Sequence, residues 1–231
     1  MSAISEKFEE LKSRGEMALI TFTMSGDPSP SETVEIASAM ERGGADMIEL
    51  GLCFSDPIAD GPVIQAASDR AMRTGISQED YFAVAGEIHN LVSVPLISLT
   101  YYNMVLRYGV SRFMRSCVRS GISGLVVPDL PVDEAGEVIE ASRRHGVDTV
   151  FLAAPTSSDD RIGRIARSSS GFVYLVSVLG VTGTRRKIPE VGELIHKRRS
   201  GGSRLWHLLS STCIRVEEDG CRRCYSGECD S

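Results

Sequence analysis

Residues 18–52 read ALITFTMSGDPSPSETVEIASAMERGGADMIELGL, and this stretch places an amphipathic helix pattern between two apolar runs. The runs ALITFTM (18–24) and DMIELGL (46–52) are nearly continuous in hydrophobicity, which is typical of strands buried on both faces of a parallel sheet. Between them, SETVEIASAMERGG (31–44) has helical periodicity and ends in two glycines, which favour a helix stop. The stretch therefore predicts one strand–helix–strand unit of an α/β protein.

The same alternation continues toward residue 195. Further apolar, β-branched runs that indicate strands are VPLISLTYY (94–102), GLVVPDL (124–130), TVFLAAP (149–155) and GFVYLVSV (171–178). Further helical patterns, each followed by glycine, are VSRFMRSCVRSG (110–121), VDEAGEVIEASRRHG (132–146) and SDDRIGRIARSSSG (158–171). Six such units fit either a (β/α)8 barrel or an open doubly wound sheet.

Two observations favour the barrel. No G-x-G-x-x-G motif follows the first predicted strand, so the best sign of a dinucleotide-binding sheet is missing. Polar and acidic residues also gather where the predicted strands end, which is the active face of a (β/α)8 barrel. We therefore predict an incomplete barrel, with units one to six in residues 1–195.

Composition narrows the function classes. The 231 residues are 42% hydrophobic and 24% charged, as in ordinary globular proteins, and the net charge of −6 disfavours a general nucleic-acid or membrane-binding surface. No apolar run reaches the roughly 18 residues of a membrane span. The first residues are charged and lack the apolar core of a signal peptide. We expect a cytoplasmic protein without nucleic-acid or membrane partners.

The densest group of reactive side chains is in IELGLCFSDPIADGPVIQ (48–65). Glu49 falls inside the second predicted strand, where a buried carboxyl can gain a raised pKa, and Asp60 falls in the loop that follows, where a carboxylate can stay ionised. Two carboxyls in unlike environments suit an acid–base division of labour. Spacing alone leaves a second interpretation open, in which Asp56 and Asp60 cap a helix and Glu49 pairs with a core arginine.

Six motifs, in order, resemble the tryptophan synthase α subunit family. They are TFTMSGDP (21–28), the stretch 48–65, LTYYN (99–103), VPDLPVDE (127–134), APTSSDDRI (154–162) and YLVSVLGVTGTR (174–185). The resemblance implies a lyase of tryptophan biosynthesis that cleaves indole-3-glycerol phosphate to indole and glyceraldehyde 3-phosphate by a retro-aldol reaction. It also implies an α2β2 complex with a β subunit that receives the indole, and no metal or organic cofactor.

The same resemblance assigns residues to the site. Glu49 and Asp60 correspond to the two catalytic acids. The substrate-binding residues it implies are Phe22, Leu99, Tyr101, Tyr174, Thr182 and Gly183. Of these, Phe22, Leu99 and Tyr101 are expected to hold the indole ring, and the other three are expected in the pocket wall and the mobile loop after the sixth strand.

The resemblance stops near Ile195, where the family continues with glycine-rich phosphate-binding loops of a seventh and an eighth unit. Residues 196–231 instead read HKRRSGGSRLWHLLSSTCIRVEEDGCRRCYSGECDS. We expect this tail to be aberrant and poorly structured, to leave the sixth strand unpaired at its outer edge, and to deprive the chain of activity. The alternative function is an inactive truncated barrel that keeps only partner docking.

Two interpretations of the tail stay open. One is a metal site built from His207, Cys213, Cys221, Cys224 and Cys229, although only one C-x2-C pair is present. The other is a frame shift: the Trp206 codon TGG followed by the C of His207 forces an overlapping glycine codon. Shifted codons around 206 and 227 permit the two glycine motifs that the family has at a similar separation. We interpret the tail as frame-shifted.

Overall fold

The structure is a computed structural model that describes residues 1–154, 156–176 and 206–209. Its strands form one parallel sheet in chain order. They are β1 (Ile20–Met24), β2 (Met47–Gly51), β3 (Leu96–Leu99), β4 (Ile122–Val126), β5 (Asp148–Ala153), β6 (Phe172–Leu175) and β7 (Trp206–Leu209). Every neighbouring pair is parallel, so the predicted strands 1–6 are confirmed.

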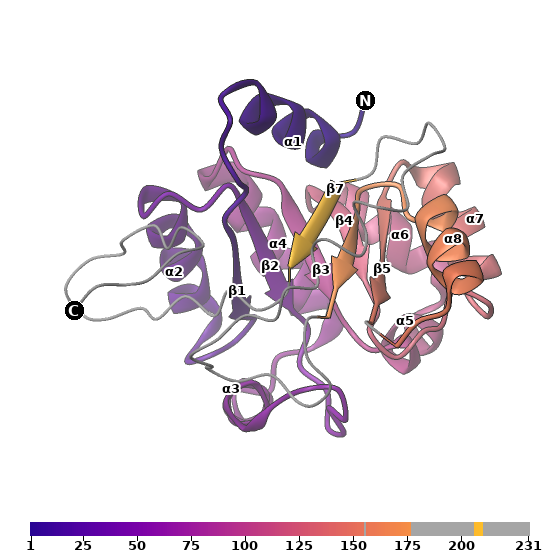
Figure 1. The fold of residues 1–231 in the computed structure, drawn as a ribbon. Helices are drawn as coiled ribbons and strands as arrows, with labels where there is room; N and C mark the ends of the chain where they lie inside the picture. Colours follow the sequence, from indigo (N-terminus) through magenta and orange to yellow (C-terminus); the bar gives the residue numbers. More distant parts are fainter. Residues whose placement is uncertain (155, 177–205, 210–231) are drawn as a thin grey trace.

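Helices surround this sheet (Figure 1). They are α1 (Ala3–Ser13), α2 (Pro30–Arg42), α3 (Pro62–Arg73), α4 (Gln78–Leu91), α5 (Tyr102–Tyr108), α6 (Val110–Arg119), α7 (Gly136–His145) and α8 (Asp159–Ser168). The four helices predicted from the sequence are α2, α6, α7 and α8. Ser29 caps α2, because its Oγ accepts a hydrogen bond from the Glu32 N–H.

The architecture is an incomplete (β/α)8 barrel with two apolar cores. One core lies between the sheet and the outer helices and includes Leu50, Tyr81 and Phe113. The other lies inside the curve of the sheet and includes Met47, Ile97 and Phe172, together with Ile4 and Phe8 of α1. Figure 1 shows α1 across the amino ends of the strands and α3 near their carboxyl ends. The inner core is therefore closed at one end, and the opposite end is left for a site.

The tail departs from expectation at one place. Trp206–Leu209 forms β7, which pairs in parallel with β6, so the expected open outer edge of β6 is wrong for these residues. Short apolar runs can complete a sheet edge through backbone hydrogen bonds whatever their origin. The proposed boundary at 195 and the four tail cysteines lie outside the described residues.

Within the described part of the chain, no helix has the length and apolar character to cross a membrane.

Candidate active site

Glu49 is the middle residue of β2 and faces the interior of the barrel. It lies in register with Phe22 of β1 and Ile97 of β3, and it shares its sheet face with Met47 of the inner core. The side chain is only 4% exposed, and its Oε1 has no hydrogen-bond partner among the described residues. Burial without a compensating charge raises the pKa of this carboxyl to about 7.

The structure contradicts the pairing alternative for Glu49. Among the salt bridges of the described residues, none involves Glu49. A carboxyl that is buried and unpaired holds its proton until the pH nears neutrality, which is the range in which a general acid or base works best. Glu49 therefore has the environment that the acid–base interpretation requires.

Asp60 lies at the end of the loop between β2 and α3, and it is also buried. The capping alternative is wrong for this residue, because Gly61 is the N-cap of α3 and has no side-chain cap bond. Burial raises the pKa of the Asp60 carboxyl, and a hydrogen bond from Tyr101 lowers it in part. Asp60 thus has a polar partner, whereas Oε1 of Glu49 has none among the described residues, so the two carboxyls sit in unlike environments.

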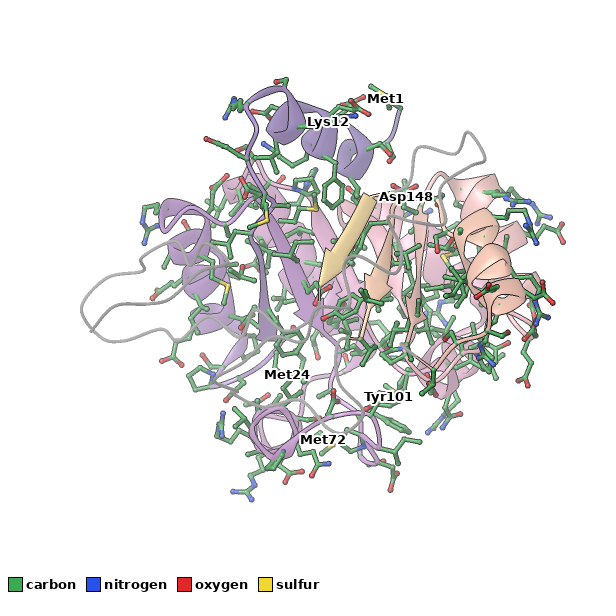
Figure 2. The ribbon with its side chains drawn as sticks, in the orientation of Figure 1. Met1, Lys12, Met24, Met72, Tyr101 and Asp148 are labelled. Carbon is green, nitrogen blue, oxygen red and sulfur yellow. The ribbon has the colours of Figure 1, made fainter. Side chains whose placement is uncertain are left out.

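Tyr101 connects β3 to this loop. Its hydroxyl donates a 3.0 Å hydrogen bond to Oδ2 of Asp60 and accepts one of 3.0 Å from the Ala59 N–H. Figure 2 shows Tyr101 at the carboxyl end of the sheet, the same end as Met24 and Met72. The sequence predicts Tyr101 only as a pocket-lining residue, and its bond to Asp60 was missed because nothing in the local pattern indicates it.

Two residues expected to hold the indole ring, Phe22 and Leu99, share the interior face with Tyr174 of the expected pocket wall. Leu99 of β3 and Tyr174 of β6 pack against the inner core, and Phe22 of β1 packs with Met24 and its neighbours at the carboxyl end. Gly51 makes room for Phe22: a Cβ built there would lie 2.8 Å from the Phe22 Cζ. Thr182 and Gly183 lie outside the described residues.

Helix α3 holds the Asp60 loop against the barrel. Ser68 Oγ accepts a 3.1 Å hydrogen bond from the Phe54 N–H and donates one of 3.1 Å to the Phe54 carbonyl. Arg70 forms a two-pronged ion pair with Asp27, at 2.7 Å for each nitrogen–oxygen contact. Neither contact could be predicted from the local sequence, since each joins residues more than ten positions apart.

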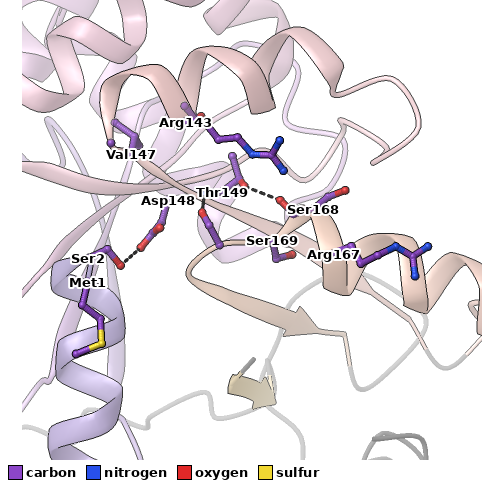
Figure 3. A pocket seen from close by; sticks show the side chains of 12 residues that line it. Met1, Ser2, Arg143, Val147, Asp148, Thr149, Arg167, Ser168 and Ser169 are labelled. Carbon is purple, nitrogen blue, oxygen red and sulfur yellow. Dashed lines mark hydrogen bonds between the residues drawn. The ribbon is translucent and has the colours of Figure 1, made fainter. Parts of the chain in front are cut away.

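A separate cavity of about 310 Å³ lies at the opposite, amino end of the strands. Figure 3 shows it between the start of α1 and the turns before β5 and β6, where Ser2 donates a hydrogen bond to Asp148. None of the candidate site residues lines it. In (β/α)8 barrels the amino end serves stability and the carboxyl end carries catalysis, so we assign the site to the carboxyl end.

The fold is a (β/α) barrel, and two buried carboxyls lie near the carboxyl ends of its strands. This combination is typical of one class of protein, the barrel enzymes that use acid–base chemistry. Comparison with known proteins gives the particular family. The family model described as tryptophan synthase alpha chain matches residues 8–201. The chain belongs to the tryptophan synthase alpha chain family.

Individual relatives agree with this assignment. The tryptophan synthase alpha chain of Methanosarcina barkeri is 48% identical over 200 residues, which cover 86% of this chain and 75% of the relative. Mycobacterium tuberculosis tryptophan synthase superposes with a TM-score of 0.82 at 34% identity, over 89% of this chain and 79% of that one. The tryptophan synthase α2β2 complex of Pyrococcus furiosus gives a TM-score of 0.67 at 42% identity, over 70% and 68%.

Proposed function

We propose that Glu49 and Asp60 are the two acids of the family's lyase reaction, the retro-aldol cleavage of indole-3-glycerol phosphate to indole and glyceraldehyde 3-phosphate. The observation that supports this most strongly is the contrast between the two carboxyls. Glu49 is buried and unpaired with a pKa of about 7, whereas Asp60 is held by the Tyr101 hydroxyl. The docking-only alternative gains no support from the relatives, which are named as tryptophan synthase alpha chains.

The chemistry assigns a different task to each carboxyl. Cleavage requires a proton to reach C3 of the indole and another to leave the side-chain hydroxyl, while the ring nitrogen gains positive charge. Glu49, with its proton affinity matched to neutral pH, takes the hydroxyl proton and delivers a proton to C3. Asp60, ionised and facing the ring N–H, stabilises the positive charge that develops there. The carbon–carbon bond then breaks to give the aldehyde and the neutral ring.

Apolar side chains hold the ring between these acids. Phe22, Leu99 and Tyr174 lie on the interior face of the sheet, where an aromatic ring removed from water is bound favourably. This proposal needs no metal ion and no organic cofactor, because each proton and charge is handled by a side chain.

Replacement of either acid by its amide tests the assignment. In the chain with its reading frame restored after residue 195, Glu49→Gln and Asp60→Asn should each lower the rate of indole formation by roughly 10²-fold or more, because they keep shape and remove proton exchange or charge. The matched controls are Glu87→Gln on α4 and Asp69→Asn on α3, both exposed, which should change the rate by less than about twofold. Near-normal turnover in either acid variant would show that its role is misassigned.

We also propose that the chain docks on a tryptophan synthase β subunit through its carboxyl-end loops, in an α2β2 complex like that of the Pyrococcus furiosus relative. Three apolar side chains at that end are open to solvent: Ile58 is 79% exposed, Val63 76% and Leu106 47%. Exposed apolar groups on neighbouring loops can form an interaction surface. Because indole is apolar and crosses membranes, direct transfer between docked subunits retains it. The mobile loop expected around Thr182 and Gly183 lies outside the described residues.

A pull-down with the β subunit tests the docking surface. Ile58→Asp should weaken binding at least tenfold, because a charge would be buried against the partner. The control is Leu91→Asp at the end of α4, where an apolar side chain of similar exposure, 62%, lies at the opposite end of the barrel. Equal binding by both variants would contradict the proposed surface.

We also propose a cytoplasmic location. The substrate is a charged phosphate ester that does not cross membranes freely, so the enzyme that uses it is expected in the same compartment. Cell fractionation tests this location.

A further inference from the structure

The loop from Leu52 to Gly61 is gripped by two buried hydroxyl groups that come from other elements. One belongs to Tyr101, which follows β3, and the other to Ser68, in the middle of α3. Each hydroxyl both donates and accepts a hydrogen bond on this loop. The two contacts lie at opposite ends of the loop, near Ala59 and Asp60 and at Phe54.

At the Asp60 end, one oxygen of Tyr101 meets two consecutive residues. It accepts from the Ala59 N–H at 3.0 Å and donates to the Asp60 carboxylate at 3.0 Å. The Tyr101 hydroxyl therefore fixes the position of the Ala59 backbone and of the Asp60 carboxylate at the same time. Gln65 adds a third contact, because its Nε2 donates to the Asp60 carbonyl at 2.9 Å.

At the Phe54 end, Ser68 satisfies both backbone groups of one residue at 3.1 Å each. The Phe54 ring in turn lies beside the Tyr101 ring, with centroids 5.1 Å apart and planes inclined by 30°. The two ends are thereby connected through side chains. The Phe54 ring therefore joins the Ser68 contact to the Tyr101 ring.

We propose that Tyr101 and Ser68 are positioning residues that hold the Asp60 carboxylate in the direction its reaction requires, an inference that rests on the proposed function of Asp60. Neither hydroxyl exchanges a proton with substrate in this scheme. Tyr101 acts by direct contact with the carboxylate, and Ser68 acts through Phe54 and the Tyr101 ring.

The charges around Asp60 support this role. The titratable groups on the adjoining elements are Glu49 on β2, Asp56 on the same loop, Tyr101 itself and Asp129 after β4. Burial raises the pKa of Asp60, and the Tyr101 hydrogen bond is the contact that lowers it. Burial, Asp60 and Asp129 also raise the pKa of Tyr101 well above its ordinary value, so the phenol keeps the proton that it donates.

The experiment is a pH titration of the Asp60 carboxyl by ¹³C NMR in the full chain, with Asp60→Asn used to assign the signal. Tyr101→Phe keeps the ring beside Phe54 and removes the donor, so the Asp60 pKa should rise by about one pH unit. Ser68→Ala should raise it in the same direction by a smaller amount. Ser68→Thr restores a hydroxyl at that position and should return the titration toward that of the unmodified chain.

Two controls separate positioning from general loss of stability. Tyr81→Phe removes a buried hydroxyl that bonds to Leu50 and Ser98 on the outer face of the sheet, and Ser142→Ala removes a buried serine hydroxyl from α7. Both should leave the Asp60 titration unchanged. An unchanged Asp60 pKa in Tyr101→Phe, or an equal shift in Tyr81→Phe, would overturn the inference.

Activity measurements separate this inference from the proposed function. Assayed for indole formation with the β subunit in the frame-restored chain, Tyr101→Phe should lose several-fold in kcat/KM, with a larger loss at acidic pH than at pH 8, because only the ionised Asp60 stabilises the ring charge. Full activity in Asp60→Asn would refute the proposed function of Asp60, whereas the NMR titration tests the hydroxyl contacts without requiring turnover.

Discussion

At the scale of single residues, the properties of the site depend on the hydrogen-bond partners and the burial of each carboxyl group. Glu49 has an oxygen without a hydrogen-bond partner among the described residues, in an interior lined by apolar side chains. Native proteins seldom leave a buried polar atom unpaired, because its desolvation is costly. Such a residue in a barrel core indicates that function rather than stability selected it.

The raised pKa of Glu49 makes the stability of the fold depend on pH. Between the ordinary value of 4.5 and about 7, the folded carboxyl holds a proton that the unfolded chain has released. The folded state therefore binds more protons, and its stability falls as the pH rises through this window. Glu49→Gln has no such proton, so it should gain up to roughly 3 kcal/mol relative to the unmodified chain between pH 5 and pH 8. Urea unfolding at both pH values measures this, and a constant difference would contradict it.

Gly51 controls the position of the Phe22 ring. An added Cβ would lie 2.8 Å from the Phe22 Cζ and 3.0 Å from the Met24 Sδ, so Gly51→Ala must displace a ring expected to hold the indole. In the frame-restored chain we expect a several-fold rise in KM and a stability loss of about 1–3 kcal/mol. The control is Gly136→Ala in α7, where no atom lies within 4 Å of the added methyl group. Steady-state kinetics and urea unfolding decide, and an unaltered KM in Gly51→Ala would count against Phe22 as a ring contact.

At the scale of elements, α1 closes the amino end of the barrel. Its Ile4 reaches the backbone of β4 at Gly124, where a Cβ would lie only 2.6 Å from the Ile4 Cδ1. Phe8 meets the Phe172 ring of β6 edge to face, with centroids 5.7 Å apart. A helix outside the β/α repeat thus supplies side chains to the inner core, which would otherwise open to water at this end.

Removing a buried side chain of α1 should lower the stability of the fold, although α1 is far from the proposed catalytic site. Phe8→Ala should lower the free energy of unfolding by roughly 3 kcal/mol, because it removes a buried aromatic side chain and leaves a cavity. Glu6→Gln, on the exposed face of the same helix, should change it by less than about 0.5 kcal/mol. Denaturant unfolding compares the two. Similar losses in both variants would show that α1 does not plug the core.

At the scale of the whole molecule, the described strands form an open sheet whose ends are β1 and β7. The family-model match ends at residue 201, and our interpretation of residues 196–231 as frame-shifted remains a prediction. If it holds, the glycine-rich loops that bind the substrate phosphate through backbone N–H groups are missing from this chain.

Restoration of the reading frame after residue 195 tests this interpretation. The restored chain should be more soluble and should form indole, whereas the 231-residue chain should show no measurable lyase activity, because phosphate contacts and core side chains are lost together. Soluble yield, thermal melting and indole assays on both chains provide the comparison. A cooperatively melting 231-residue chain with turnover equal to that of the restored one would refute the frame shift.

The sequence by itself determined the class of fold and predicted the two candidate acids. Apolar runs alternating with helical periodicity predict a parallel β/α sheet, because both signals are local and repeat along the chain. It did not reveal α1, α3, α4 and α5 as helices, although the capping box of Ser77 and Asp80 is a readable signal for α4. Glu49 and Asp60 were identifiable because a dense motif surrounds them.

Only the tertiary structure decided how those acids are held. It showed that Glu49 lacks a charged partner among the described residues, that Tyr101 bonds to Asp60 across 41 positions, and that Ser68 binds Phe54 across 14. It also placed β7 beside β6. Such contacts depend on sheet register and on the path of the connecting loops, and a residue's sequence neighbours carry no record of either. For this reason the chemistry could be predicted from local pattern, whereas the supports that orient it could not.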